Sequence, residues 1–182
     1  MINYNYSWFE QIQQSIYTDP VTQNLSTPTD INQAAKTEIS VLVGPSYGII
    51  SAGDATILNS LTDLITSGYI ANPTAQQIDA YLDNLYNQVQ IYSTQVTSSF
   101  AQNICGFWMN ESDPNKRPRT TKKMGKEKDQ IMGILGSFLG GLIGGLAGWL
   151  IGNSQGHTGD KLEEDAEIGY VVGAIIGWLL LP

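Results

Sequence analysis

The only histidine of the sequence, His157, lies in a segment whose residues could bind phosphate or activate a nucleophile. The segment GNSQGHTGDK (152–161) combines glycines with a lysine and small polar residues. It lacks the Gly-Lys-Ser/Thr ending that contacts phosphates and Mg²⁺ in a phosphate-binding loop. A histidine in such a polar, glycine-rich segment is more typical of a solvated turn than of a catalytic base. The pattern therefore predicts neither a phosphate site nor a catalytic triad.

Thiol and metal chemistry have equally few candidates. Cys105 is the single cysteine, which excludes an internal disulfide and a multi-cysteine zinc site. Its apolar neighbours in NICGFWM predict a buried, unreactive thiol. The acidic residues of 160–167 lack the alternating spacing of a calcium loop. We expect no catalytic residue, no metal and no cofactor, and we interpret the protein as a non-enzyme.

Positive charge is concentrated in one short run, although the chain as a whole carries a net charge of −8. The acidic balance argues against nucleic acid as a partner. The run directly precedes the most apolar segment, which favours a flank that contacts anionic lipid headgroups; a solvated linker is the alternative. Seven of the nine Lys and Arg residues form it: Lys116, Arg117, Arg119, Lys122, Lys123, Lys126 and Lys128.

The apolar segment 131–152 is both hydrophobic and rich in glycine. Its 22 residues include no ionisable side chain, and this length suffices to cross a hydrocarbon layer about 30 Å thick. Each helix-interior glycine costs roughly 0.5–1 kcal/mol relative to alanine in water, whereas small residues at a spacing of four allow close helix packing in lipid. The main glycine stripe consists of Gly136, Gly140, Gly144, Gly148 and Gly152, and a second line contains Gly133, Ser137, Gly141 and Gly145.

A second apolar run, 168–182, repeats the spacing at Gly169, Gly173 and Gly177. It is short for a full membrane span. A polar turn, 153–167, separates the two runs, so the pattern predicts a helical hairpin with glycine-striped inner faces. Aromatic residues near its ends favour a membrane interface; these expected anchors are Trp149, Tyr170 and Trp178.

The arrangement GLIGGLAGWLIGN…GYVVGAIIGW resembles the glycine-zipper membrane hairpins of assorted bacterial envelope and secreted proteins. The resemblance covers residues 131–182 alone and is carried by a periodicity. It implies membrane insertion and association between helices, not one particular activity. Several such proteins carry a signal peptide and a lipid-modified cysteine, and this sequence shows neither pattern.

The first hundred residues contain repeated helix signals. In SWFE, Ser7 and Glu10 form an expected capping box, and in DINQ we expect Asp30 to cap a helix that ends at Gly44-Pro45. The portion ISVLV could instead form a short strand. A further helix is expected from Asp54 to Gly68.

A fourth helix is expected after the turn Asn72-Pro73-Thr74. Its apolar positions form a heptad seam typical of helix-on-helix packing; they are Ile78, Leu82, Leu85, Val89, Tyr92 and Val96. The seam weakens at Ser99, although an apolar face continues to about Phe107. The sequence thus predicts an all-α protein with an N-terminal helical bundle (1–108), a basic linker (109–130) and a glycine-rich hairpin (131–182).

These patterns favour a membrane-active protein whose hairpin inserts into a membrane and packs against copies of itself. Such a protein would be a permeabilising secreted or packaged effector, or a virion protein that assists cargo through an envelope. Two alternatives stay open: a resident two-span anchor with a cytoplasmic partner-binding bundle, and a structural subunit that buries the hairpin in an assembly. A hairpin hidden inside amphipathic helices would resemble the water-soluble form of pore-forming toxins.

The expected partners are anionic lipids, further copies of the chain, and a delivery or assembly partner for residues 1–108. The first residues, MINYNYSWFEQ, lack the basic and apolar regions of a cleavable signal peptide. We therefore expect a cytoplasmic origin followed by membrane association, after non-classical export, packaging or lysis.

Overall fold

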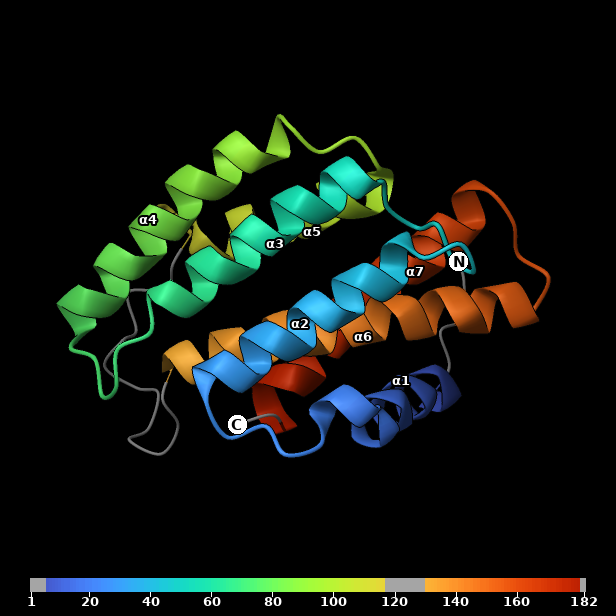
Figure 1. Cartoon of the computed structure of the whole chain (residues 1–182), viewed down its shortest axis with the longest axis horizontal. Coiled ribbons are helices and arrows are strands. Elements are labelled where there is room, and N and C mark those ends of the chain that lie inside the picture. Colours follow the sequence, from blue (N-terminus) through green and yellow to red (C-terminus); the bar gives the residue numbers. More distant parts are fainter. Residues whose placement is uncertain (1–5, 117–129, 181–182) are drawn as a thin grey trace.

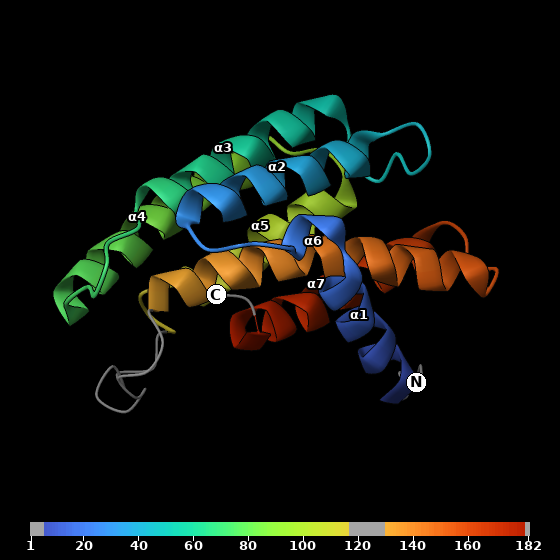
Figure 2. The ribbon, with the colours of Figure 1, turned by 60° about the horizontal axis from the view of Figure 1, so that its bottom comes forward.

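Helix α6 (Gln130–Ser154) runs through the middle of the structure, and several other helices pack against it (Figures 1 and 2). The computed structural model describes residues 6–116 and 130–180, and within these ranges it contains helices and no β-strand. The predicted all-α class is confirmed. The remaining helices are α1 (Tyr6–Thr18), the 3₁₀-helix η1 (Pro20–Thr22), α2 (Pro28–Val43), α3 (Ala52–Ser67), α4 (Ala75–Ser93), α5 (Ser99–Ser112) and α7 (Asp160–Leu180).

The N-terminal helices and the apolar hairpin share one hydrophobic core. Helix α6 contacts α1, α2, α3 and α7, while α7 also packs against α1 and α5. Figure 2 shows α1 crossing the hairpin and α2, α3 and α4 lying on another side of α6. Buried side chains of the bundle, such as Ile39 and Leu58, belong to the same cluster as Leu139 and Leu142 of α6. Segments 1–108 and 131–182, which the sequence divides by composition, therefore pack as one body.

Reciprocal capping boxes begin three of the helices, and they correct two predicted helix starts. Thr27 caps α2 and Ser51 caps α3, so Asp30 and Asp54 occupy the third helical position and accept the N–H of the capping residue. The third box, between Thr74 and Gln77, begins α4. A short hydroxyl side chain reaches the exposed N–H three residues later, and the aspartate returns the bond. The expected helix starts at Asp30 and Asp54 are therefore too late, since α2 begins at Pro28 and α3 at Ala52.

Three further expectations from the N-terminal half differ from the structure. The expected cap Ser7 lies within α1, which begins at Tyr6, and its Oγ accepts a hydrogen bond from Gln11 Nε2. The alternative strand at ISVLV is wrong, because these residues form the end of α2. The apolar face from Ile78 to Phe107 divides into α4 and α5, since Ser98 caps a new helix.

The hairpin is longer than its apolar runs. Helix α6 continues to Ser154, and α7 begins at Asp160, eight residues before the expected start at Ile168. The connecting turn is therefore short and uses positive φ angles at Gly156 (80°) and Gly159 (55°). Acidic residues in the first turn of α7 face the positive end of the helix dipole, which explains why this polar stretch is helical.

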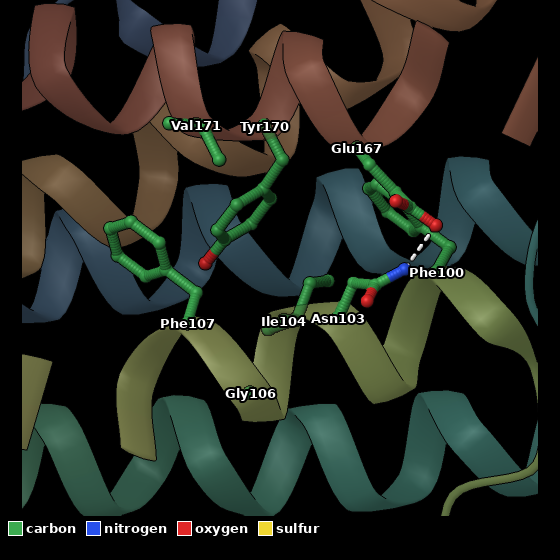
Figure 3. Close-up of a pocket in the computed structure, with 8 residues that line it drawn as sticks. All are labelled: Phe100, Asn103, Ile104, Gly106, Phe107, Glu167, Tyr170 and Val171. Atoms are coloured by element: carbon green, nitrogen blue, oxygen red, sulfur yellow. Dashed lines mark hydrogen bonds between the residues drawn. The ribbon is translucent and has the colours of Figure 1, made fainter. Parts of the chain in front are cut away.

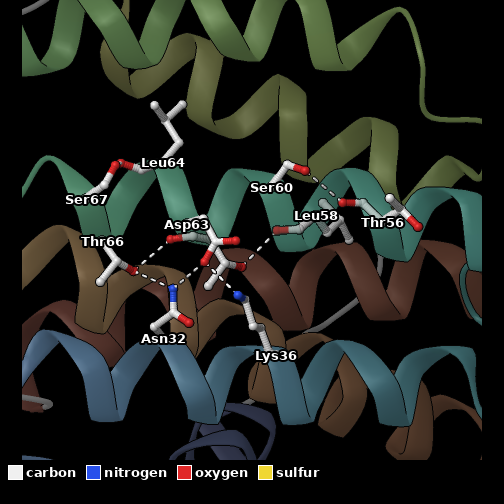
Figure 4. Close-up of polar contacts among 10 residues, drawn as sticks. Asn32, Lys36, Thr56, Leu58, Ser60, Asp63, Leu64, Thr66 and Ser67 are labelled. Atoms are coloured by element: carbon white, nitrogen blue, oxygen red, sulfur yellow. Dashed lines mark hydrogen bonds and ion pairs between the residues drawn. The ribbon is translucent and has the colours of Figure 1, made fainter.

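A polar contact on the outside of the bundle connects α2 and α3 (Figure 4). The Asp63 carboxylate accepts hydrogen bonds from Lys36 Nζ at 2.6 Å and from Asn32 Nδ2 at 3.0 Å. Asn32 also donates to Thr66 Oγ1. Hydrogen bonds from Lys36 and Asn32 lower the pKa of Asp63. Exposed ion pairs of this kind contribute little to stability.

Candidate functional site

The two hairpin helices pack backbone to backbone along the predicted glycine stripe. A Cβ atom added to Gly140 would lie 2.4 Å from the Gly173 carbonyl oxygen, and one added to Gly144 would lie 2.3 Å from that of Gly169. The reverse holds from α7, where a Cβ on Gly177 would lie 2.1 Å from the Gly136 oxygen. Only glycine permits this approach, so the stripe joins α6 to α7 within one chain.

The second small-residue line of α6 faces aromatic rings. A Cβ added to Gly141 would lie 2.8 Å from the ring of Tyr170, and one added to Gly145 would lie 2.4 Å from the ring of Phe100. A Cβ added to Gly133 would lie 2.8 Å from the ring of Trp178. Tyr170 and Trp178 belong to α7, whereas Phe100 belongs to α5. The glycines of α6 therefore serve two contacts, one with backbone and one with aromatic side chains.

Helix α6 is hidden from solvent over most of its length. Every residue from Gly133 to Gly145 is buried, and Leu150 near the end is 42% exposed. Among the described residues, Gly133–Ser154 is the one segment long and apolar enough to cross a membrane. In its most apolar stretch, 83% of the residues are buried inside the molecule. The core helix of a soluble protein can have the same length and composition.

A buried carboxylate holds the turn of the hairpin. Asp165 is fully buried, and its Oδ2 lies 2.5 Å from His157 Nδ1. Among the described residues, none donates a hydrogen bond to its Oδ1. A Cβ on Gly152 would lie 2.0 Å from Asp165 Oδ2, so this last glycine of the main stripe makes room for a side chain. The predicted solvated histidine is instead 17% exposed and contacts this aspartate.

Helices α5 and α7 are joined by an aromatic cluster (Figure 3). The indole Nε1–H of Trp108 donates to the hydroxyl oxygen of Tyr170 at 2.7 Å, and both side chains are buried. The rings of Phe100 and Phe107 each meet Tyr170 edge to face. Closer to the N-terminal end of α5, Asn103 Nδ2 donates a hydrogen bond to the Glu167 carboxylate of α7. Such edge-to-face pairs stabilise beyond the area they bury.

The three expected interface anchors have different surroundings. Tyr170 is buried in the aromatic cluster. Trp149 is half-buried and meets Tyr47 edge to face at a centroid distance of 5.6 Å. Trp178 is half-buried against Gly133. In this closed arrangement all three rings pack against protein.

Of the seven basic residues expected to contact lipid, one lies within the described part of the chain. Lys116 Nζ donates to Asn110 Oδ1 at 2.8 Å and lies 3.9 Å from Asp113 Oδ2. The other six lie outside the described residues: Arg117, Arg119, Lys122, Lys123, Lys126 and Lys128.

Reactive chemistry has little basis in the described residues. No group of three or more His, Cys, Asp and Glu residues in 6–116 and 130–180 is placed to hold a metal ion. Burial, with a smaller effect of the Asp54 charge, raises the pKa of the Cys105 thiol to about 11, which disfavours the reactive thiolate. Cys105 is fully buried, as its neighbours predicted.

Sequence reasoning missed one titratable group. Glu38 of α2 is 3% exposed, and its Oε2 has no hydrogen-bond partner within residues 6–116 and 130–180. Burial and the nearby charge of Asp19 raise its pKa to about 7. The signal in the sequence is its place on the apolar face of α2, four residues after Ala34 and four before Leu42, which are both buried.

Comparison with protein-family models, with curated proteins and with solved structures gives no match for this chain. The functional inference therefore rests on the hairpin and its surroundings.

Proposed function

We propose that this protein is a non-enzymatic, membrane-active protein that stores its glycine-packed hairpin inside a helical bundle and inserts it into a membrane. The observation that carries the proposal is the burial of α6. A helix with no ionisable side chain from 131 to 152 is enclosed by amphipathic helices. The bundle keeps the protein soluble until a membrane offers the helix an equally apolar environment.

The contacts of the hairpin support its movement as a unit. Helices α6 and α7 approach through glycine backbone, as at Gly144 and Gly173, whereas the contacts of α6 with α1 and α2 are made by side chains of the common core. Hydrocarbon chains are as apolar as leucine, so lipid can replace those side-chain contacts. Nothing in lipid replaces the close glycine contact, which favours retention of the helix pair.

Opening of the bundle would also free a surface for association with other copies. The main glycine stripe is occupied by α7, but Gly145 of the second line faces Phe100 of α5. When the hairpin leaves the bundle, Gly145 loses its contact with Phe100. Small residues on an exposed face favour helix association in lipid, so homo-oligomers would form through the Gly145 face.

The acidic turn is the main barrier to insertion. Asp160, Glu163 and Glu164 are exposed at the start of α7, and charged carboxylates are costly in hydrocarbon. The basic run before α6 would hold the opposite end of the hairpin at anionic headgroups. Insertion should therefore increase when the vesicles carry anionic lipid.

The test uses the full chain with vesicles that contain phosphatidylglycerol or only phosphatidylcholine. Anionic vesicles should release an entrapped dye and should raise the reaction rate of Cys105 with a water-soluble maleimide by at least about tenfold, since local opening exposes the thiol. The Cys105→Ala variant controls for unspecific labelling. The absence of both dye release and faster Cys105 labelling, at neutral and at mildly acidic pH, would overturn the proposal.

A soluble structural subunit is the second candidate, and the same burial favours it. The bundle already buries most of the apolar surface of α6 without a membrane. In that case Cys105 would stay protected and the dye would stay entrapped under every lipid condition. A resident two-span anchor differs from both, because the chain would then be recovered only with membranes.

A further inference from the structure

Two lines of side chains with a spacing of four border a groove between α5 and α7 (Figure 3). Asn103 of α5 pairs with Glu167 of α7, and Phe107 of α5 meets Tyr170 further along α7, so the two helices run in the same direction. The groove consists of two adjoining hollows of about 260 and 360 Å³ that share Phe107 and Val171. It follows both helices for several turns.

The middle of the groove is apolar and exposed. Val171, Ile175 and Leu179 are 44%, 54% and 64% exposed and occupy one face of α7. They are three of the eight large hydrophobic residues that are exposed in the described chain, and they are the only ones of the eight that follow each other at a spacing of four. Such a stripe is typical of a surface that binds another helix.

Gly106 gives the groove room for a second helix. It is exposed in the interior of α5, and a Cβ added to it would have no atom within 4 Å. An interior glycine costs roughly 0.5–1 kcal/mol of helix stability relative to alanine, and here no contact within the chain requires it. Glycines inside α6 and α7, such as Gly140, Gly144, Gly169 and Gly173, by contrast have close neighbours.

Carboxylates border the apolar middle at its two ends. Glu167 lines one hollow and Glu111 lines the other, and no lysine or arginine of the described residues lines either. Glu167 lies beside Asn103 of α5, and Glu111 follows Asn103 by eight residues on the same helix. The two carboxylates are therefore about 12 Å apart along the helix axis. This charge pattern is complementary to a helix with two basic residues at that separation. It disfavours an anionic lipid surface, and the net charge of −8 disfavours a second copy of the chain.

We propose that the groove between α5 and α7 binds an amphipathic helix of a partner protein, with an aliphatic stripe against Phe107, Val171 and Ile175 and with Lys or Arg near Glu111 and Glu167. The bound helix would cover the exposed face of α7 and connect it to α5. The inference does not depend on membrane insertion, because it concerns the closed structure alone.

The probe is an alanine-based peptide of about 15 residues with a leucine stripe and two lysines about eight residues apart. Its partner peptide has glutamate in place of both lysines. Isothermal titration calorimetry with the full chain should show at least about tenfold tighter binding of the lysine peptide, as expected for two charge-assisted contacts. Equal affinities, or no binding of either peptide, would overturn the proposal.

Substitutions then place the peptide in the groove. Gly106→Leu fills open space, and Ile175→Asp puts a charge in the apolar stripe, so each should weaken lysine-peptide binding at least about tenfold. Ile91→Asp on α4 is the matched control, since Ile91 is 49% exposed and lies outside the groove. Circular dichroism checks that each variant stays folded. Unchanged binding of the lysine peptide to both groove variants would contradict the assignment. Binding of anionic vesicles to the groove, without binding of the lysine peptide, would contradict it as well.

Discussion

The Trp108 indole donates a hydrogen bond to the Tyr170 hydroxyl oxygen across the buried contact between α5 and α7, with a nitrogen-to-oxygen distance of 2.7 Å. The bond joins the N-terminal helices to the hairpin inside an apolar region. Neither side chain can lose its partner there without leaving a buried polar group unsatisfied. This pair is therefore a specific point at which the bundle holds α7.

Removal of the Tyr170 hydroxyl should destabilise the protein measurably. We expect Tyr170→Phe to lower the free energy of unfolding by about 1–3 kcal/mol, because the Trp108 N–H remains buried without an acceptor. A double-mutant cycle with Trp108→Phe, followed by urea denaturation, should give a coupling energy of at least about 0.5 kcal/mol. Tyr17→Phe is the control, since Tyr17 is half exposed on α1; an equal loss in this variant would contradict the assigned role.

The glycine contact between α6 and α7 should tolerate no side chain. We expect Gly144→Ala to lower the free energy of unfolding by about 1–3 kcal/mol, because its Cβ would lie 2.3 Å from the Gly169 oxygen and the helices must separate. The matched variant Gly106→Ala should instead gain roughly 0.5–1 kcal/mol from helix propensity. Urea denaturation of the two variants checks the sign. A gain in both would show that α6 and α7 do not touch there.

Glu38 should make the protein less stable as the pH rises. Its pKa is raised to about 7 from an ordinary 4.5, so the neutral form is favoured in the fold. The stabilising effect of this raised pKa is fully present below about 4.5 and is lost as the pH rises through about 7. Glu38→Gln should abolish this dependence and raise the free energy of unfolding by about 3 kcal/mol at mildly alkaline pH.

Thermal unfolding across this pH range measures the effect. Glu10→Gln, at an exposed position of α1, should retain the pH dependence of the parent chain. An identical pH profile for Glu38→Gln and the parent chain would show that the Glu38 carboxyl is not buried. Acid should therefore stabilise the closed bundle through Glu38 and oppose its opening.

Asp54 should make the protein less stable as the pH falls into the acidic range, which is the opposite of the effect of Glu38. Burial alone would raise its pKa, but hydrogen bonds from Thr97, Ser51 and Ser98 together lower it well below 3.8. Its contribution is therefore present above about 3.8 and is lost as the pH falls through the lowered pKa. We expect Asp54→Asn to cost about 1–3 kcal/mol at neutral pH and to flatten the acid limb of the stability profile.

Asp30→Asn is the matched control, because Asp30 has the same position in the capping box of α2 but no partner from a distant segment among the bonds it accepts. Its loss should be smaller than that of Asp54→Asn, since Asp54 also accepts the N–H groups of Thr97 and Ser98 at the start of α5. Equal losses, measured by urea denaturation, would show that the contact with α5 contributes nothing.

The sequence by itself determined the all-α class and the helices of the hairpin. Glycines at a spacing of four lie on one face of any helix, so the close approach of α6 and α7 follows from local periodicity. Helix starts were harder to assign, because a capping box contains two polar residues and either can be taken for the cap. Asp30 and Asp54 show this ambiguity.

Only the tertiary structure decided what surrounds the hairpin. The hydrophobicity of α6 predicts that this helix is shielded from water, but a bilayer and a protein interior both provide such shielding. Which of the two surrounds α6 depends on its contacts with α1 and α2, which are remote in sequence. The buried state of Glu38, the bond between Trp108 and Tyr170, and the open space at Gly106 depend on the same remote contacts. Periodicity records which face of a helix is apolar, whereas the partner of that face is set by packing across the whole chain.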